Sequence, residues 1–261
     1  MIFGRKKHTS VDSDAEEAAG ATTHTEDPAQ SAEERLVDSG LSPDADGSEQ
    51  QAAARTAPAD EWELLDESKD WRTEGPFDIT EVDLEADDVE RLDFGSLVLT
   101  PFDGMQLQLQ VNQATQEVQA VLVVQGQSVL ELSLFAAPAH HSMLPTIRAE
   151  MMENTNSAGG TFTLGKGPFG TEVRRVVPLT TPDGQHGYHV SRTWFAQGPR
   201  WLLRGVLMGE AGVSEGIEGP AELLYEFFAN TVVRRGERPM VPGDLIPLSL
   251  PENLGSQPEA R

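Results

Sequence analysis

The chain has 261 residues, no cysteine and a formal net charge of −24. The missing cysteines exclude disulfides, thiolate metal sites and a cysteine nucleophile, and they agree with the reducing, cytoplasmic location that we expect. The negative charge repels phosphate backbones and argues against general nucleic-acid binding. No run of about 20 apolar residues occurs, so we expect no transmembrane segment.

The acidity is concentrated at the N-terminal end, where residues 1–93 carry a net charge of −19. Residues 1–59 contain almost no large apolar side chains. Such a segment buries too little surface to offset roughly 1–2 kcal/mol of backbone entropy per residue. We therefore predict a disordered acidic tail over residues 1–59 and a short disordered C-terminus over residues 251–261.

Residues 60–92 form a distinct segment, because apolar side chains alternate with acidic ones. Two of the four tryptophans, Trp62 and Trp71, lie here. One interpretation is an arm that packs its aromatic residues on the folded domain. The other is an acidic-aromatic segment that folds on a protein partner.

Residues 93–250 carry the pattern of a folded domain. Met105, Leu107, Leu109 and Val111 alternate with polar residues, which is the period of a half-buried strand. Turn residues separate this run from the next ones. The further strand-like runs are 96–99, 118–124, 129–135, 161–164, 171–177, 185–195, 201–208 and 231–233.

Two segments have helical spacing instead. Ser142 is placed to cap a helix that ends at Gly159 and Gly160, and Pro220 opens a second helix over 221–230. The residues expected to face inward are Leu144, Ile147, Met151, Met152, Leu223, Leu224, Phe227 and Phe228. The predicted fold class is α+β, with a largely antiparallel, curved β-sheet and two α-helices after the long disordered acidic N-terminal tail.

Two glycine-rich motifs imitate nucleotide-binding loops. Residues 160–167 nearly match a phosphate-binding loop, but Gly167 stands where a hydroxyl must reach magnesium. Residues 165–170 fit the dinucleotide fingerprint, yet strand-like residues follow where a helix must begin. The interior of the first motif is typical of a strand, and a hairpin turn explains the second. We predict no catalytic residue, no metal ligand and no cofactor.

One set of residues is retained as a candidate binding surface. Arg200 and Arg204 alternate with Trp201 along a predicted strand, and Arg174 and Arg192 fall on neighbouring strands. These arginines could hold an anionic ligand, or they could hold the protein's own tail, Asp78 to Asp93, by charge complementarity. We favour the internal role.

Several short runs resemble a family of actinobacterial proteins, the domain of unknown function 3710. They are Gly167–Gly170, Pro182–Gly184, Gly198–Gly205 and Thr231–Arg234. The resemblance extends over most of residues 75–250. It implies a bacterial cytosolic protein and supplies no active residues.

Without a catalytic constellation, an enzyme is the less favoured class. The leading hypothesis is a non-enzymatic protein-binding or adaptor module that engages its partner through residues 60–92 or a sheet face. The alternative is a small-anion or nucleotide-binding protein that uses the arginine-lined sheet face.

Overall fold

The computed structural model describes residues 60–115, 117–181 and 184–251. The predicted acidic tail lies outside these residues, as does nearly all of the predicted C-terminal segment. Within the described ranges, the strands form two sheets that are largely antiparallel, and the predicted α+β class is confirmed. No helix in these ranges is long and apolar enough to cross a membrane.

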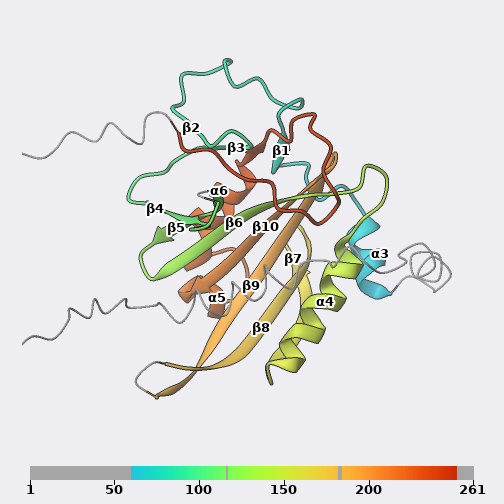
Figure 1. The fold of residues 1–261 in the computed structure, drawn as a ribbon, viewed down its shortest axis with the longest axis vertical. Coiled ribbons are helices and arrows are strands. Elements are labelled where there is room, and N and C mark those ends of the chain that lie inside the picture. The colour runs from blue at the N-terminus through green and yellow to red at the C-terminus, as the bar shows by residue number, and fades with distance from the viewer. Residues whose placement is uncertain (1–59, 116, 182–183, 252–261) are drawn as a thin grey trace, which may run out of the picture. The chain divides into compact units, whose positions relative to one another are not determined.

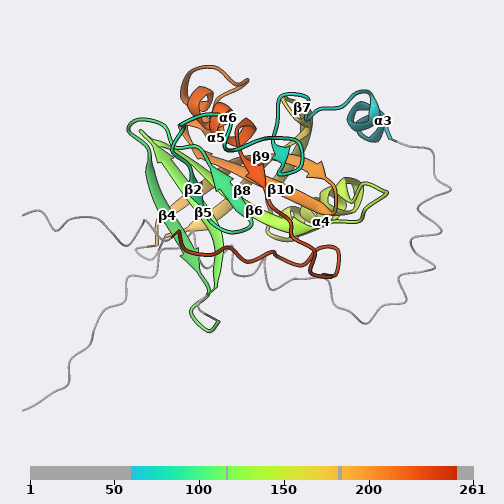
Figure 2. The ribbon, with the colours of Figure 1, turned by 90° about the horizontal axis from the view of Figure 1, so that it is seen from above.

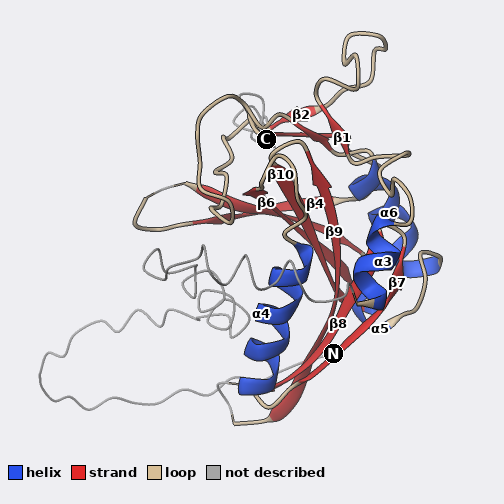
Figure 3. Cartoon of the chain, turned by 90° about the vertical axis from the view of Figure 1, so that its right-hand side faces the viewer, coloured by secondary structure: helices blue, strands red, loops and turns tan. Residues whose placement is uncertain are grey.

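A seven-stranded antiparallel sheet is the centre of the fold, with spatial order β4-β5-β6-β10-β9-β8-β7 (Figure 1). The hairpin between β7 and β8 closes with Gly167 opposite Gly170, so the glycine-rich segment is the predicted turn. The long strands β8 and β9 bend along their length (Figure 3). The strands are β4 (Gln106–Val111), β5 (Val118–Gln125), β6 (Ser128–Ala136), β7 (Thr161–Gly167), β8 (Gly170–Thr180), β9 (His186–Gly198) and β10 (Trp201–Gly209).

Helices cover both faces of this sheet. Figure 3 shows α4 (Leu144–Ser157) on one side and α5 (Glu210–Val213) with α6 (Glu222–Ala229) on the other. The two predicted helices are confirmed as α4 and α6. The sequence patterns missed α5 and α3 (Glu61–Glu67), which are too short to show a helical period.

Two details of the helix predictions were wrong. Met143, not Ser142, is the N-cap of α4, although the Ser142 hydroxyl accepts a hydrogen bond from the Leu144 amide at 3.2 Å. Met152 and Leu223 were expected to face inward, but they are 45% and 38% exposed. Each lies next to a residue of the apolar stripe and extends the apolar run without facing the sheet.

A second sheet of four very short strands has the order β1-β11-β3-β2. Here β1 runs parallel to β11, so Phe77 lies opposite Val232 although the two are far apart in sequence. This small sheet and α6 share one buried cluster with the large sheet and complete its cover. The bounds are β1 (Phe77–Asp78), β2 (Leu92–Asp93), β3 (Leu97–Leu99) and β11 (Val232–Val233).

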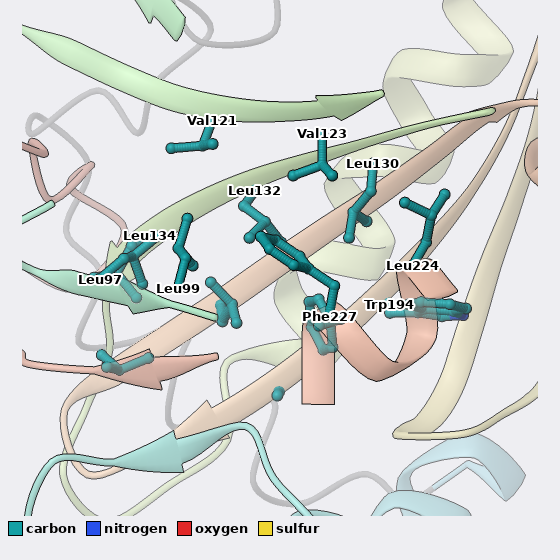
Figure 4. Close-up of a cluster of buried hydrophobic side chains, with 14 of the residues drawn as sticks. Leu97, Leu99, Val121, Val123, Leu130, Leu132, Leu134, Trp194, Leu224 and Phe227 are labelled. Carbon is teal, nitrogen blue, oxygen red and sulfur yellow. The ribbon is translucent and has the colours of Figure 1, made fainter. Parts of the chain in front are cut away.

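The main core lies between α6, the small sheet and the large sheet (Figure 4). Leu132 of β6, Trp194 of β9 and Phe227 of α6 meet there and are almost fully buried. Burying a side chain of this size stabilises the fold by about 1.5–3 kcal/mol. Gly205 lets α6 approach closely, since a Cβ at this position would lie 2.6 Å from the Phe228 ring.

The segment that precedes the large sheet is attached to it by buried polar contacts. The indole nitrogen of Trp201 donates to Asp78 Oδ2 at 2.8 Å, and both residues are buried. Burial acts to raise the pKa of Asp78, but hydrogen bonds from Thr80 and Trp201 and the Arg72 charge together hold it below its usual value. Residues near Asp78 are therefore fixed to the domain.

Replacement of Asp78 by alanine tests this attachment. The buried indole N–H of Trp201 would lose its acceptor, which costs about 1–3 kcal/mol of unfolding free energy. Urea denaturation followed by tryptophan fluorescence measures the loss. Asp87→Ala is the control, because Asp87 pairs with Arg91 on the surface and its loss should hardly move the midpoint. Equal effects of the two substitutions would contradict the assignment.

Candidate functional site

The structure distributes the predicted arginine set over three locations. Arg174 and Arg192 are direct register partners on β8 and β9, as expected. Arg204 lies on the opposite face of the sheet, because it alternates with the core residue Leu203. Arg200 lies in the turn that joins β9 to β10. The residues do not form one row.

At the first location, the Glu172 carboxylate of β8 accepts hydrogen bonds from both Arg174 and Arg192. Its Oε1 atom accepts from Arg192 Nε at 3.0 Å and from Arg174 Nε at 2.8 Å. Its Oε2 atom accepts from Arg192 Nη2 at 2.8 Å and from the Trp194 indole at 2.7 Å. The side chains of Glu172 and Arg192 are 1% and 2% exposed, so this is a buried bidentate ion pair.

The remaining donors of Arg192 hold the segment that follows β10. They bind the backbone carbonyls of Ala211 at 3.2 Å, Ser214 at 2.9 Å and Gly216 at 2.8 Å. A guanidinium has five N–H groups, and all five of Arg192 are used. Arg192 therefore positions α5 on the sheet and has no free donor for a ligand.

Glu172→Gln should lower the unfolding free energy by about 3–5 kcal/mol, because it leaves the buried Arg192 without its counter-charge. Chemical denaturation of the variant measures the loss. The matched control is Glu215→Gln, which removes the 85% exposed partner of Arg174 at the surface end of the same network. We expect a change within about 1 kcal/mol for the control. Similar losses in both variants would contradict the buried-pair assignment.

The pKa of Glu172 predicts how this pair responds to acid. Burial acts to raise the pKa, but the hydrogen bonds and charge of Arg192, with donors from Trp194 and Arg174, outweigh burial and lower it. Stability from the ionised carboxylate is thus fully present above the unfolded pKa of about 4.3 and is lost as pH falls through the folded pKa. The stability gap between wild type and Glu172→Gln should be constant from pH 7 to pH 5 and narrow below pH 4. Denaturation curves across this range measure the gap, and a gap that stays constant would contradict the sign.

Arg204 and Trp201 are also committed to internal contacts. Arg204 Nη2 donates to Glu131 Oε1 at 2.9 Å, and its guanidinium lies 5.3 Å from the Phe135 ring centroid. Trp201 is fully buried, with the Arg72 guanidinium 5.0 Å from its ring centroid. The favoured interpretation was pairing of these arginines with the tail over Asp78–Asp93. Arg174, Arg192 and Arg204 are instead paired with Glu172, Glu215 and Glu131.

The predicted aromatic-acidic arm lies against the domain at several points. The Asp66 carboxylate accepts from the Thr171 amide at 2.7 Å and pairs with Arg148 of α4. The Lys166 ammonium of β7 lies 5.9 Å from the Trp71 ring centroid. The contacts therefore resemble the packed arm more than a segment held ready for a partner.

The outer border of β4 is the feature that the sequence patterns did not single out. β4 is the terminal strand of the large sheet and, among the described residues, pairs only with β5 (Figure 2). Leu107 and Leu109 pack against the core, whereas Gln106 and Gln108 are exposed. The strand contains no charged residue and no proline. The opposite terminal strand, β7, carries Lys166.

Edge strands present unpaired backbone N–H and C=O groups, and natural proteins protect them with charges, prolines, bulges or covers. Along β4 the one irregularity is a register shift between Gln110 and Val111, at its end. The strand is six residues long and contains neither a charge nor a proline that would protect this border. The alternation of glutamine and leucine predicted the strand, but only the strand order shows that β4 lies at the border of the sheet.

The chain folds as an α+β domain built on an open antiparallel sheet that ends at β4. Buried charges such as Glu172 and Arg192 pair with each other inside the domain. The chain belongs to the family described as protein of unknown function (DUF3710), whose sequence profile matches residues 75–257. No curated protein matches the chain.

A crystal structure of a protein from Bacteroides thetaiotaomicron is similar in part. The similarity covers 55% of this chain and 47% of the other, so this chain spans about half of that protein's length. Sequence identity is 13% and the TM-score is 0.31, which is too low to transfer fold or function.

Proposed function

We propose that this protein is a non-enzymatic binding module whose β4 edge receives an extended segment of a partner protein. The proposal rests on the border of β4, which is uncharged and has no strand partner on its outer side within the described ranges. In strand addition, main-chain hydrogen bonds supply affinity, and alternate side chains of the accepting strand supply specificity. The exposed Gln106 and Gln108 side chains would contact the added strand.

The charge of the chain favours a different protein over a second copy. Two copies that each carry −24 repel one another, whereas a neutral or basic segment meets no such barrier. The partner segment is therefore expected to be extended, free of acidic residues and able to pair with Gln106–Val111.

In this proposal residues 60–92 pack on the domain, and the partner protein binds at β4 instead of at residues 60–92. A cytoplasmic location is part of the proposal and rests on the cysteine-free sequence. General nucleic-acid binding is not part of it, because the net charge opposes phosphate contacts.

A photo-crosslinking amino acid at Gln108 tests the site in cells that naturally make the protein. The same amino acid at Thr163 is the matched control, since Thr163 is exposed on β7 at the other border. We expect an adduct at position 108 that is absent at position 163, with the crosslink in an extended segment of another protein.

A synthetic peptide of the crosslinked segment then provides a quantitative readout. It should bind the full chain, and Gln108→Lys should weaken binding about 10-fold, or 1.4 kcal/mol, because strand addition would desolvate the new charge. Thr163→Lys should leave the affinity unchanged. An adduct with a second copy of this chain, or equal effects of both lysines, would overturn the proposal.

A further inference from the structure

The turn between β9 and β10 holds Arg200 in an unusual backbone conformation. Arg200 has φ = 63°, and it is the one non-glycine residue with positive φ in the described ranges. Asn, Asp and especially Gly adopt this region more readily than a long side chain does. The backbone conformation at Arg200 is therefore unfavourable for an arginine. Its side chain is exposed, so core packing does not explain why an arginine occupies this position.

A second arginine lies against this turn. Arg235 Nε donates to the Arg200 carbonyl at 3.0 Å, and Arg235 Nη1 donates to the Arg238 carbonyl at 2.9 Å. In return, Arg200 Nη2 donates to the Gly236 carbonyl at 3.2 Å. Each guanidinium thus binds the backbone of the other's loop, which holds the two cations close together.

Unlike the seven arginines that pair with carboxylates, Arg200 and Arg235 have no salt-bridge partner among the described residues. Arg235 is nevertheless only 9% exposed. Burial and then the Arg200 charge lower the pKa of Arg235, so the two cations destabilise each other. By contrast, the arginines that do pair with carboxylates are Arg72, Arg91, Arg148, Arg174, Arg192, Arg204 and Arg234.

Some donors of the pair are not used by any residue that the structure describes. Among the described residues, Arg200 Nη1 and Nε and Arg235 Nη2 have no hydrogen-bond partner. Guanidinium groups match the geometry of oxyanions through paired N–H donors. Two adjacent cations are neutralised by one doubly charged anion, whereas a single carboxylate would neutralise only one of them.

We propose that Arg200 and Arg235 form a binding site for a phosphate group, either free phosphate or the phosphate of a small ligand. The site lies where the β9–β10 turn meets the loop after β11, and it is independent of the β4 edge. It retains one residue of the predicted arginine set and adds Arg235, which the sequence patterns did not single out. The visible signal was the Arg234-Arg235-Gly236 run directly after a strand.

Thermal unfolding of the full chain with inorganic phosphate tests the site. Acetate and chloride at matched ionic strength control for general salt effects, and adenosine monophosphate distinguishes a phosphate carried by a small ligand from free phosphate. At about 100 times its Kd, a bound ligand raises the midpoint by on the order of 5 °C in a domain of this size. We expect a saturable shift with phosphate or adenosine monophosphate and none with acetate or chloride.

Arg200→Gly separates binding from folding. Glycine relieves the left-handed backbone and removes the like charge beside Arg235, so the ligand-free midpoint should stay the same or rise while the phosphate shift disappears. Arg200→Asn should behave in the same way, because asparagine also tolerates this conformation. Arg174→Gln is the matched control, since it removes an arginine already paired with Glu172 and should retain the shift.

Three outcomes would overturn the proposal. They are the absence of a phosphate-specific shift in the wild type, an undiminished shift in Arg200→Gly, and loss of the shift in Arg174→Gln as well. Titration calorimetry with the same ligand and variants should agree, with affinity at least 10-fold weaker in Arg200→Gly.

Discussion

The ion pair between Glu172 and Arg192 joins two strands of the large sheet to the segment that follows β10. Arg192 extends from β9 to a carboxylate on β8, and it also binds three carbonyls of the segment after β10. A buried charge is tolerated only when its partners satisfy it, and here every donor is satisfied. One guanidinium therefore connects adjacent strands to the short helix α5, which covers the same face.

This use of charge explains why an acidic chain keeps arginines inside its fold. Glu172, Glu131 and Asp66 each accept from an arginine with a mostly buried side chain. Against this background the Arg200–Arg235 pair is an exception, since the protein supplies it with no carboxylate in the described ranges.

The sequence predicted the strands of the large sheet well, because alternation in runs such as 105–111 depends only on which side is buried. It also predicted α4 and α6, which are long enough to show a helical stripe. It missed β1 and β2, since two residues carry no period. β1 pairs with β11, which is distant from it in sequence. β2 pairs with β3, and the tertiary fold defines that pairing.

The candidate sites were harder to predict for a physical reason. Residue spacing indicates which side of a strand an arginine faces, but it does not identify the carboxylate that meets it. Glu172 satisfies Arg174 and Arg192 through contacts between strands, and sequence alone shows it as one acidic residue among many. Likewise, nothing in the composition of β4 shows that it is a terminal strand, because strand order is a property of the whole topology.

The parallel pairing of β1 with β11 has a consequence for biosynthesis. Phe77 leaves the ribosome about 155 residues before its partner Val232, which at roughly 5–20 residues per second is a delay on the order of ten seconds or more. Throughout that interval the buried face of the first segment has no strand to join. The small sheet is thus a late product of translation, and the nascent chain must keep Phe77 from wrong partners until its last strand emerges.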